Sequence, residues 1–395
     1  MKAPKHRRKL LFGVVASISV LVASAAYVQI QADKSWQAMV ALGEEVRQQW
    51  QRQPQARTPL WGEATDDYAF EHYSRAATLI DSVDGDRRAF FKMFGKSDAE
   101  VAALAAELRS AWQPSLAAMH SGAHSLRALR YAKGVGDEEI LTLRTFRSVT
   151  NAAMLEARIL RHEGNATGSM QLTLDSMTMA SDIFHSGDVI NQMIGIALLA
   201  IAMDPWPDEE LAQLDEQTAA SFARGLARLD ERMPTRMLTS RETLFMAEHL
   251  QKVPDQGDWC GMGTWRYGFS QRWMLADAVL MTARNFERLE QVPGENWIAR
   301  KELYDQIVEE VQASSNTAAH CMFPHLISAE QSIRHTVGHV RMLRMALDMH
   351  RGIASEPLAD PFGTGALVIE ENDRKLLIKS IGNAGHDKLE RLVAL

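Results

Sequence analysis

The residues LEARILRHEGNATGSMQLTLDSMTMASDIF, Leu155–Phe184, decide the fold class of this chain. Apolar and small side chains recur in this stretch at spacings of three and four residues, on both sides of the turn sequence Glu163-Gly164-Asn165. We therefore expect two helices, Asp137–His162 and Ala166–Phe184, that pack as an αα-hairpin. Apolar residues occupy more than one narrow stripe of the first helix, which predicts a central helix packed on several sides.

The same helical spacing extends in both directions from this pair, and β-branched clusters are scarce after residue 30. Before the pair, we expect helices over Asp66–Val83, from Ser97 with a capping box to Glu100, and from Pro114 to about Tyr131. After it, we expect helices over Asp188–Met203, from Pro207, and over about Pro234–Gln251, Thr264–Leu289, Glu295–Ser315 and Phe323–Arg351. The predicted class is all-α, with an irregular array of helical hairpins over residues 66–352.

The tail, residues 353–395, is the one part of the chain with strand character. Ala366–Glu370 and Lys375–Ile381 are rich in apolar and β-branched residues and flank a polar four-residue stretch. They predict a small β-hairpin that docks on the helices. Asp360 and Asp387 in the same tail suit turns, and with loop carbonyls they offer oxygen ligands for calcium.

Two stretches resemble known proteins. The helices around Leu155–Phe184 resemble tetratricopeptide-like helix pairs, although the period is irregular. The tail ADPFGTGALVIEENDRKLLIKSIGNAGHD, Ala359–Asp387, is similar to a C-terminal element of uncharacterised membrane-anchored all-helical proteins of the bacterial envelope. This second resemblance covers about residues 140–390. It implies a helical fold on a membrane anchor and carries no known activity.

The tail alone is also similar to that of the type II secretion major pseudopilin. Pseudopilins begin their membrane helix with Gly-Phe-Thr-Leu-x-Glu, whereas this chain has Leu10-Leu11-Phe12-Gly13 and no Glu there. The chain is therefore not expected to be a pseudopilin.

The N-terminus carries an uncharged run, LLFGVVASISVLVASAAYV, Leu10–Val28, behind five Lys and Arg residues. Its length suits one transmembrane helix, and the basic flank predicts a cytoplasmic N-terminus. We expect residues 1–9 in the cytoplasm, an anchor over 10–30 in a bacterial inner membrane, and the body in the periplasm. Residues 31–65 are expected to form a helical stalk and a Pro-containing linker. The alternative is a cleaved signal peptide with a small-residue site at Ala23-Ser24-Ala25.

The net charge and the absence of known catalytic motifs limit the classes of function that the sequence allows. The net charge of the chain is −7, and residues 10–395 carry −12, which argues against nucleic acid as a partner. The chain has no Gly-x-Ser-x-Gly, no phosphate loop and no His-Glu-x-x-His. No catalytic residue and no cofactor is therefore predicted. The expected function is a periplasmic scaffold for a protein partner, held to the membrane by its single anchor.

Two alternative functions depend on local residue clusters. An aromatic loop within residues 254–273 offers a platform for envelope glycan or peptide, through Trp259, Trp265, Tyr267 and Trp273. A cluster of histidines offers a transition-metal site or an enzyme centre, through His320, His325, His335 and His339. Cys321 lies in the same cluster and with Cys260 forms either one disulfide or two buried thiols.

Overall fold

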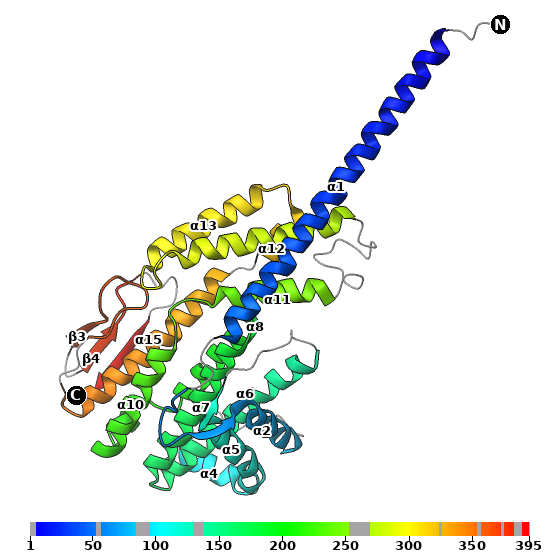
Figure 1. Ribbon diagram of the computed structural model, residues 1–395. Helices are drawn as coiled ribbons and strands as arrows, with labels where there is room; N and C mark the ends of the chain where they lie inside the picture. Colours follow the sequence, from blue (N-terminus) through cyan, green and yellow to red (C-terminus); the bar gives the residue numbers. More distant parts are fainter. Residues whose placement is uncertain are drawn as a thin grey trace. The chain divides into compact units, whose positions relative to one another are not determined.

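The computed structural model describes residues 5–52, 57–83, 93, 95–128, 137–252, 269–323, 326–353, 357–372, 375–382 and 389–394. Most of these residues are helical, and a small antiparallel sheet lies near the C-terminus (Figure 1). The predicted predominance of helix is confirmed. The chain divides into two compact units, each assembled from segments that are far apart in the sequence.

The first unit comprises Met1–Gln51, Ser240–Gln291 and Leu303–Pro324. Its helices are α1 (Lys5–Gln51), α11 (Thr239–Lys252), α12 (Phe269–Glu290), most of α13 (Trp297–Ala313) and α14 (Thr317–Met322). The C-terminal half of α1 runs along α12 (Figure 1) and buries Ala32 and Met39. Gly43 permits a close approach to α11, because a Cβ there would lie 3.1 Å from the Cβ of Ala247.

Helix α1 covers both the predicted membrane segment and the predicted stalk. The helix expected from Lys34 to Arg52 is present as the last part of α1, and it packs within its own unit rather than standing alone. Arg47 donates to Glu248 of α11 at 2.7 Å. The structure describes no helix that is long and apolar enough to cross a membrane. The side chains of residues 10–19 and 21, most of the predicted span, lie outside the described set.

The second unit comprises Arg52–Thr239, Val292–Glu302 and His325–Leu395. Its helices are α2 (Ala69–Val83), α4 (Asp98–Ala105), α5 (Arg109–Ala123), α6 (Asp137–His162), α7 (Ala166–Ser186), α8 (Val189–Met203), α9 (Asp208–Leu211), α10 (Glu216–Arg232) and α15 (Leu326–His350). Two short parallel strands, β1 (Thr65–Tyr68) and β2 (Ser125–Arg127), join the segment before α2 to the end of α5. This strand pair was not predicted.

Helix α6 is packed on several sides within this unit, as the sequence predicts, and α7 packs beside it. Residues 149–157 of α6 are buried without interruption, so α6 is enclosed on several sides. Gly164 adopts a φ of +80° in the turn between the two helices, a conformation that glycine takes without steric strain. The Asn165 side chain then accepts the Gly168 N–H at 2.9 Å and caps α7. The Ser97–Glu100 capping box of α4 is also confirmed.

The bounds of α5 differ from those predicted from Pro114, so that prediction was wrong at both ends. The helix begins at Arg109, five residues before the proline, and ends at Ala123 rather than near Tyr131. Tertiary packing holds the turn before Pro114, because Trp112 is fully buried and donates its indole N–H to Glu156 of α6 at 3.0 Å. The chain then leaves the helix to pair as β2. Local sequence patterns cannot predict these contacts, because the contacting residues are far apart in the sequence.

The predicted antiparallel hairpin of the tail is present, and a third strand that was not predicted extends it. The three strands are β3 (Val368–Asn372), β4 (Lys375–Lys379) and β5 (Glu390–Ala394), with β4 in the centre. Asn372 pairs with Lys375, so two residues rather than four separate β3 from β4. Ile378 and Val393 are fully buried, whereas Leu392, next along β5, is exposed. One face of the sheet therefore supplies apolar side chains to the core.

Asp360 ties the Asp-Pro-Phe motif of the tail to the end of β4. Its carboxylate accepts the Ser380 O–H at 2.7 Å and the Gly382 N–H at 3.0 Å, and it also accepts the N–H groups of Phe362 and Ile381. These donors confirm the turn-forming interpretation of Asp360 and occupy the oxygens that calcium binding would need. Asp387 lies outside the described residues.

A buried ion cluster holds α15, the start of α13 and the tail together. Glu330 accepts two hydrogen bonds from Arg300, at 2.7 and 2.8 Å, and one from Arg334 at 2.8 Å. Arg334 is fully buried and stacks its guanidinium over the Trp297 ring at 4.7 Å. Burial opposes ionisation of Glu330, but the hydrogen bonds and charges of the two arginines outweigh it and lower the pKa of this carboxyl.

Candidate metal centre

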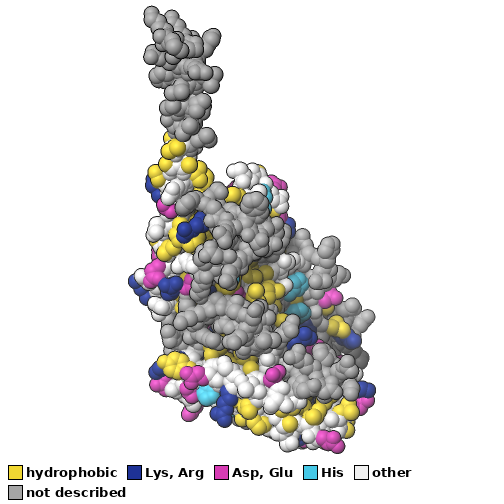
Figure 2. Space-filling view, turned by 90° about the vertical axis from the view of Figure 1, so that its right-hand side faces the viewer, with side chains coloured by type: hydrophobic (Ala, Val, Ile, Leu, Met, Phe, Trp, Pro, Cys, Tyr) yellow, Lys and Arg dark blue, Asp and Glu magenta, His cyan; other side chains and the backbone are white. Residues whose placement is uncertain are grey.

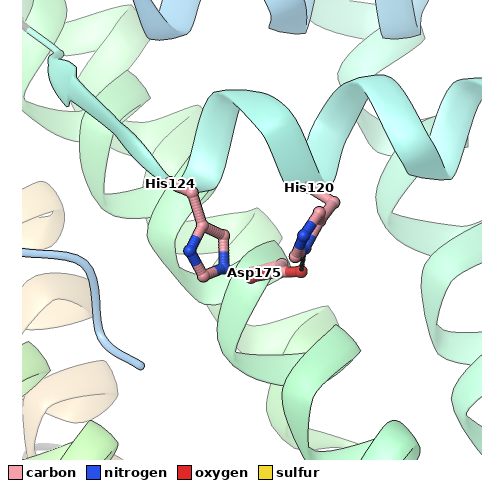
Figure 3. A group of neighbouring side chains, drawn as sticks. All are labelled: His120, His124 and Asp175. Atoms are coloured by element: carbon pink, nitrogen blue, oxygen red, sulfur yellow. Dashed lines mark hydrogen bonds and ion pairs between the residues drawn. The ribbon is translucent and has the colours of Figure 1, made fainter. Parts of the chain in front are cut away.

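Two helices of the second unit bring two histidines and an aspartate together. His120 lies in the last turn of α5, and His124 is the residue that follows this helix. The spacing of four residues places both side chains on one face, which points at the middle of α7 (Figure 3). Asp175 lies there, at the point where the three side chains meet (Figure 3). The packing of α5 on α7 therefore creates the group.

The distances within the group are short. His120 Nδ1 lies 2.8 Å from Asp175 Oδ2, and His124 Nε2 lies 3.2 Å from Asp175 Oδ1. One donor atom of each of the three residues lies within 4.8 Å of the other two. In the described part of the chain, this is the one set of three His, Cys, Asp or Glu donors with such spacing. Donors bound to one transition-metal ion lie about 3 to 3.5 Å apart, since each bond is about 2.0 to 2.2 Å long.

A second layer of contacts orients the donors. The Trp61 indole N–H donates to Asp175 Oδ1 at 2.6 Å. His124 Nδ1 lies 2.9 Å from the carbonyl oxygen of Glu63, which accepts but cannot donate. Nδ1 of His124 therefore carries a proton, and Nε2 is directed at Asp175. Metal-ligating histidines commonly hold their second nitrogen by such a bond to a carbonyl or carboxylate.

The backbone beside the histidines is shaped to fit them. Gly62 adopts a φ of +66°, and a Cβ at this position would lie 2.7 Å from Cε1 of His124. The Trp61 ring meets the His124 ring edge-on, with 4.6 Å between the centroids. The segment of residues 60–63 thus covers His124. His120 stays open, with 49% of its side chain exposed, whereas the Asp175 side chain is only 3% exposed.

The charges of the site favour cationic partners for Asp175. The hydrogen bond with Asp175 raises the pKa of His124, and it outweighs the opposing effect of partial burial. Asp175 therefore favours the protonated form of His124. The same arrangement of two imidazoles and one carboxylate can hold a divalent ion in place of the protons.

A second buried acid lies seven residues further along α7. Asp182 Oδ2 accepts the Arg57 guanidinium and the Tyr73 O–H, both at 2.7 Å. Burial and the charge of Asp182 raise the pKa of Tyr73 well above its ordinary value, so Tyr73 acts as a hydrogen-bond donor. Arg57 also donates to the carbonyls of Gly122 and Ala123 at the end of α5. Asp182 and Asp175 thus hold residues 57–61 against α5 and α7.

The histidines that the sequence singles out are placed differently. His320 belongs to the first unit, is exposed, and hydrogen-bonds the Ser314 carbonyl at 3.0 Å through Nε2. His335 and His339 belong to the second unit, where they lie one turn apart on α15. The His335 ring meets the Phe362 ring at 4.8 Å, and its Nε2 is buried without a hydrogen-bond partner among the described residues. His325 lies outside the described residues.

The other predicted sites lie mainly outside the described residues. These are the aromatic residues Trp259, Trp265 and Tyr267 and the thiol residues Cys260 and Cys321, whose side chains the structure does not describe. Trp273 is half-buried in α12. The aromatic platform and the disulfide therefore stay predictions.

The sequence contains a signal for the site that the structure reveals. His120-Ser-Gly-Ala-His124 has the same four-residue spacing as His335 and His339, and it lies in a predicted helix. Asp175 is one of two acids, with Asp182, in a helix that otherwise consists mostly of apolar and hydroxyl-bearing residues. Each feature alone is common. Only the packing of α5 on α7 shows that they belong together.

Comparisons with known proteins identify no relative. No protein-family model matches the chain. A search of curated proteins and a search of solved structures also give no match.

Proposed function

We propose that this protein binds a divalent transition-metal ion through His120, His124 and Asp175. The observation that carries the proposal is the convergence of three donor atoms within 4.8 Å from two separate helices. The second layer, formed by Trp61 and the Glu63 carbonyl, supports it, because such partners orient metal ligands in known sites.

The donor chemistry selects the class of metal. Two imidazole nitrogens and one carboxylate suit zinc, iron, cobalt or nickel. Calcium and magnesium prefer oxygen donors throughout. Three protein donors would leave at least one coordination position of such an ion without a protein ligand, and the side chain of His120 is 49% exposed. A bound ion would therefore be able to exchange or to take an external ligand.

Metal titration of the full-length protein tests the proposal. The protein is purified in detergent, stripped with EDTA, and titrated with zinc by calorimetry and with cobalt by visible absorption. We expect one ion per chain. His120→Ala is the informative variant, because this residue is exposed and its loss spares the fold. We expect that variant to bind at least about tenfold more weakly.

A matched control is available on α2. His72 and Asp67 form a comparable pair, 2.6 Å apart, but the described residues bring no third donor to it. His72→Ala should leave the stoichiometry and affinity unchanged. Absence of stoichiometric binding in the parent protein would overturn the proposal, as would a His120→Ala variant that binds like the parent.

We propose further that residues 10–30 anchor the chain in a bacterial inner membrane with the body in the periplasm. The support is the uncharged run behind five basic residues. N-terminal sequencing of the protein from membrane fractions tests the anchor. An intact N-terminus supports it, and a mature N-terminus at Ala26 contradicts it.

A second candidate function is a scaffold for an envelope protein built on tetratricopeptide-like helical hairpins. The favouring observation is the α6–α7 pair, whose short turn lets two long helices pack side by side. Figure 2 shows acidic, basic and hydrophobic side chains interspersed over the described part of one face. Crosslinking in intact cells tests this candidate, and a chain that forms no adduct in the envelope contradicts it.

A further inference from the structure

A polar cleft of about 670 Å³ lies in the second unit, between the segment of residues 60–62 and the N-terminal parts of α7 and α10. The residues that matter to the argument are Trp61, Gln171, Gln217, Ser221, Arg224 and Arg228. The volume is in the range of small-molecule sites, which run from about 300 to 1,000 Å³. His120, His124 and Asp175 do not line it.

The cleft offers unused hydrogen-bonding groups. The carboxamides of Gln171 and Gln217 make no hydrogen bond to any residue that the structure describes. Each carboxamide presents one acceptor oxygen and two N–H donors. Such paired donor and acceptor groups match the hydroxyls of a sugar, each of which can donate one bond and accept others.

The charges of the lining favour an anion. Arg224 and Arg228 lie one turn apart on α10, and both side chains are exposed at the cleft. Arg228 uses Nη1 to bond the carbonyls of Pro59 and Leu60, and Arg224 uses Nη2 to bond Ser221 Oγ at 2.9 Å. Both guanidinium groups retain further N–H donors.

Asp215 is the acid of the lining, and its oxygens are already occupied. They accept the backbone N–H of Thr218 at 2.9 Å and its hydroxyl at 2.7 Å. These bonds lower the pKa of Asp215, so it is charged near neutral pH. Two cations and one anion leave the cleft with a net positive charge.

Trp61 adds a rigid aromatic wall. Its indole N–H is held by Asp175 at 2.6 Å, and its ring packs against the two histidine rings. The ring therefore keeps one orientation while it also lines the cleft. Aromatic side chains of fixed orientation suit the apolar face of a sugar ring, since they give contact area at little entropic cost.

We propose that this cleft binds an anionic saccharide, a sugar that carries a carboxylate or a phosphate. The two arginines recognise the acidic group, the two glutamines recognise the hydroxyls, and Trp61 packs on the ring. A bare phosphate would leave the glutamines and the aromatic wall unused. The proposal does not require a bound metal ion, although Trp61 contacts both the cleft and the candidate metal centre.

Ligand-observed NMR with the full-length protein in lipid nanodiscs tests the proposal, because nanodiscs avoid detergents with sugar headgroups. The probes are glucuronic acid, glucose 6-phosphate, glucose and inorganic phosphate. We expect binding of the two acidic sugars and about tenfold weaker binding of glucose, because it lacks the ion contact. Inorganic phosphate should also bind more weakly, because it lacks the sugar contacts.

Variants locate the binding. Gln171→Ala and Arg224→Ala should each weaken acidic-sugar binding several-fold, with thermal unfolding midpoints close to that of the parent. Gln213→Ala is the control, because Gln213 is exposed and, among the described residues, its side chain bonds the Glu209 carbonyl alone. Four results would overturn the proposal: no binding of either acidic sugar, glucose binding as tightly as the acidic sugars, phosphate binding as tightly as glucose 6-phosphate, or binding that the two variants leave unchanged.

Discussion

Trp61 donates its indole N–H to Asp175 at 2.6 Å, although 114 residues separate the two in the sequence. This bond joins the segment that precedes β1 to the middle of α7, at the carboxylate that both histidines also contact. It therefore connects the candidate metal centre to the wall of the polar cleft.

Replacing Trp61 with phenylalanine keeps an aromatic ring but removes the N–H that orients Asp175. We expect zinc affinity to fall about 10- to 100-fold, as for the loss of other outer-layer partners of metal ligands. Calorimetric titration of the metal-free protein measures this. Trp273→Phe in α12 is the control and should bind zinc like the parent. Equal affinities for Trp61→Phe and the parent would contradict the role given to this bond.

Comparison of Gly62→Ala with Gly164→Ala distinguishes the effect of backbone strain from the effect of a steric clash with the His124 ring. Both glycines have positive φ, +66° and +80°, so both substitutions should lower stability by about 1 kcal/mol. A Cβ at position 62 also meets the His124 ring, whereas position 164 has open space. Only Gly62→Ala should weaken metal binding, and parallel thermal melts and zinc titrations test this. An equal loss of affinity in both variants would refute the local explanation.

The Arg57–Asp182 pair should contribute more to stability than the Tyr73 hydrogen bond to the same carboxylate. Arg57→Ala leaves a buried acid without its counter-charge, and such losses cost about 3 to 5 kcal/mol. Tyr73→Phe removes one hydrogen bond and leaves the ion pair, at about 1 kcal/mol. Urea unfolding of both variants gives the comparison. A larger loss for Tyr73→Phe would show that the ion pair is not the main contact.

Glu330 should make the protein sensitive to acid. Its folded pKa lies below the ordinary value of 4.5, so its stabilising effect is complete above that pH and is lost as the pH falls through the folded pKa. At pH 7, Glu330→Gln removes the carboxylate that two buried arginines share, and we expect a loss of about 3 to 5 kcal/mol. The difference between variant and parent should shrink below pH 4.5.

Urea unfolding midpoints between pH 7 and pH 3 measure this convergence. Glu310→Gln is the control, because its ion pair with Arg288 is exposed and should matter little. Curves for parent and Glu330→Gln that stay a constant distance apart would disprove the assignment.

Gly382→Ala should disturb the attachment of the C-terminal sheet. A Cβ there would lie 2.3 Å from the Phe362 carbonyl carbon and oxygen, so the backbone must move. Forced overpacking of this kind costs about 1 to 3 kcal/mol. Hydrogen exchange of β4 and β5 should accelerate in this variant. Gly365→Ala, which meets nothing within 4 Å, should exchange like the parent.

Local sequence determined the helical elements of this protein. The predicted bounds Asp137–His162 match α6, and Ala166–Phe184 matches α7 to within two residues. These elements are predictable because apolar spacing, a glycine turn and side-chain caps act over only a few residues. The capping box at Ser97 is a second case, since both of its bonds lie within one turn.

Tertiary structure decided where α5 begins, how many strands the tail has and which residues form a site. Trp112 holds α5 in a turn that Pro114 alone does not predict, because its partner Glu156 lies 44 residues away. The pairing of β5 with β4 was likewise not predictable from the sequence. Glu390–Ala394 has no local turn signal that would indicate a strand there.

The candidate metal centre shows the same division most plainly. The four-residue spacing of His120 and His124 is visible in the sequence, and His335 and His339 have the same spacing. Only the packing of α5 against α7 gives the first pair a carboxylate within 3.2 Å. Metal-site geometry depends on distances between helices, and those distances arise from burial of side chains along the whole length of each helix rather than from the local order of residues.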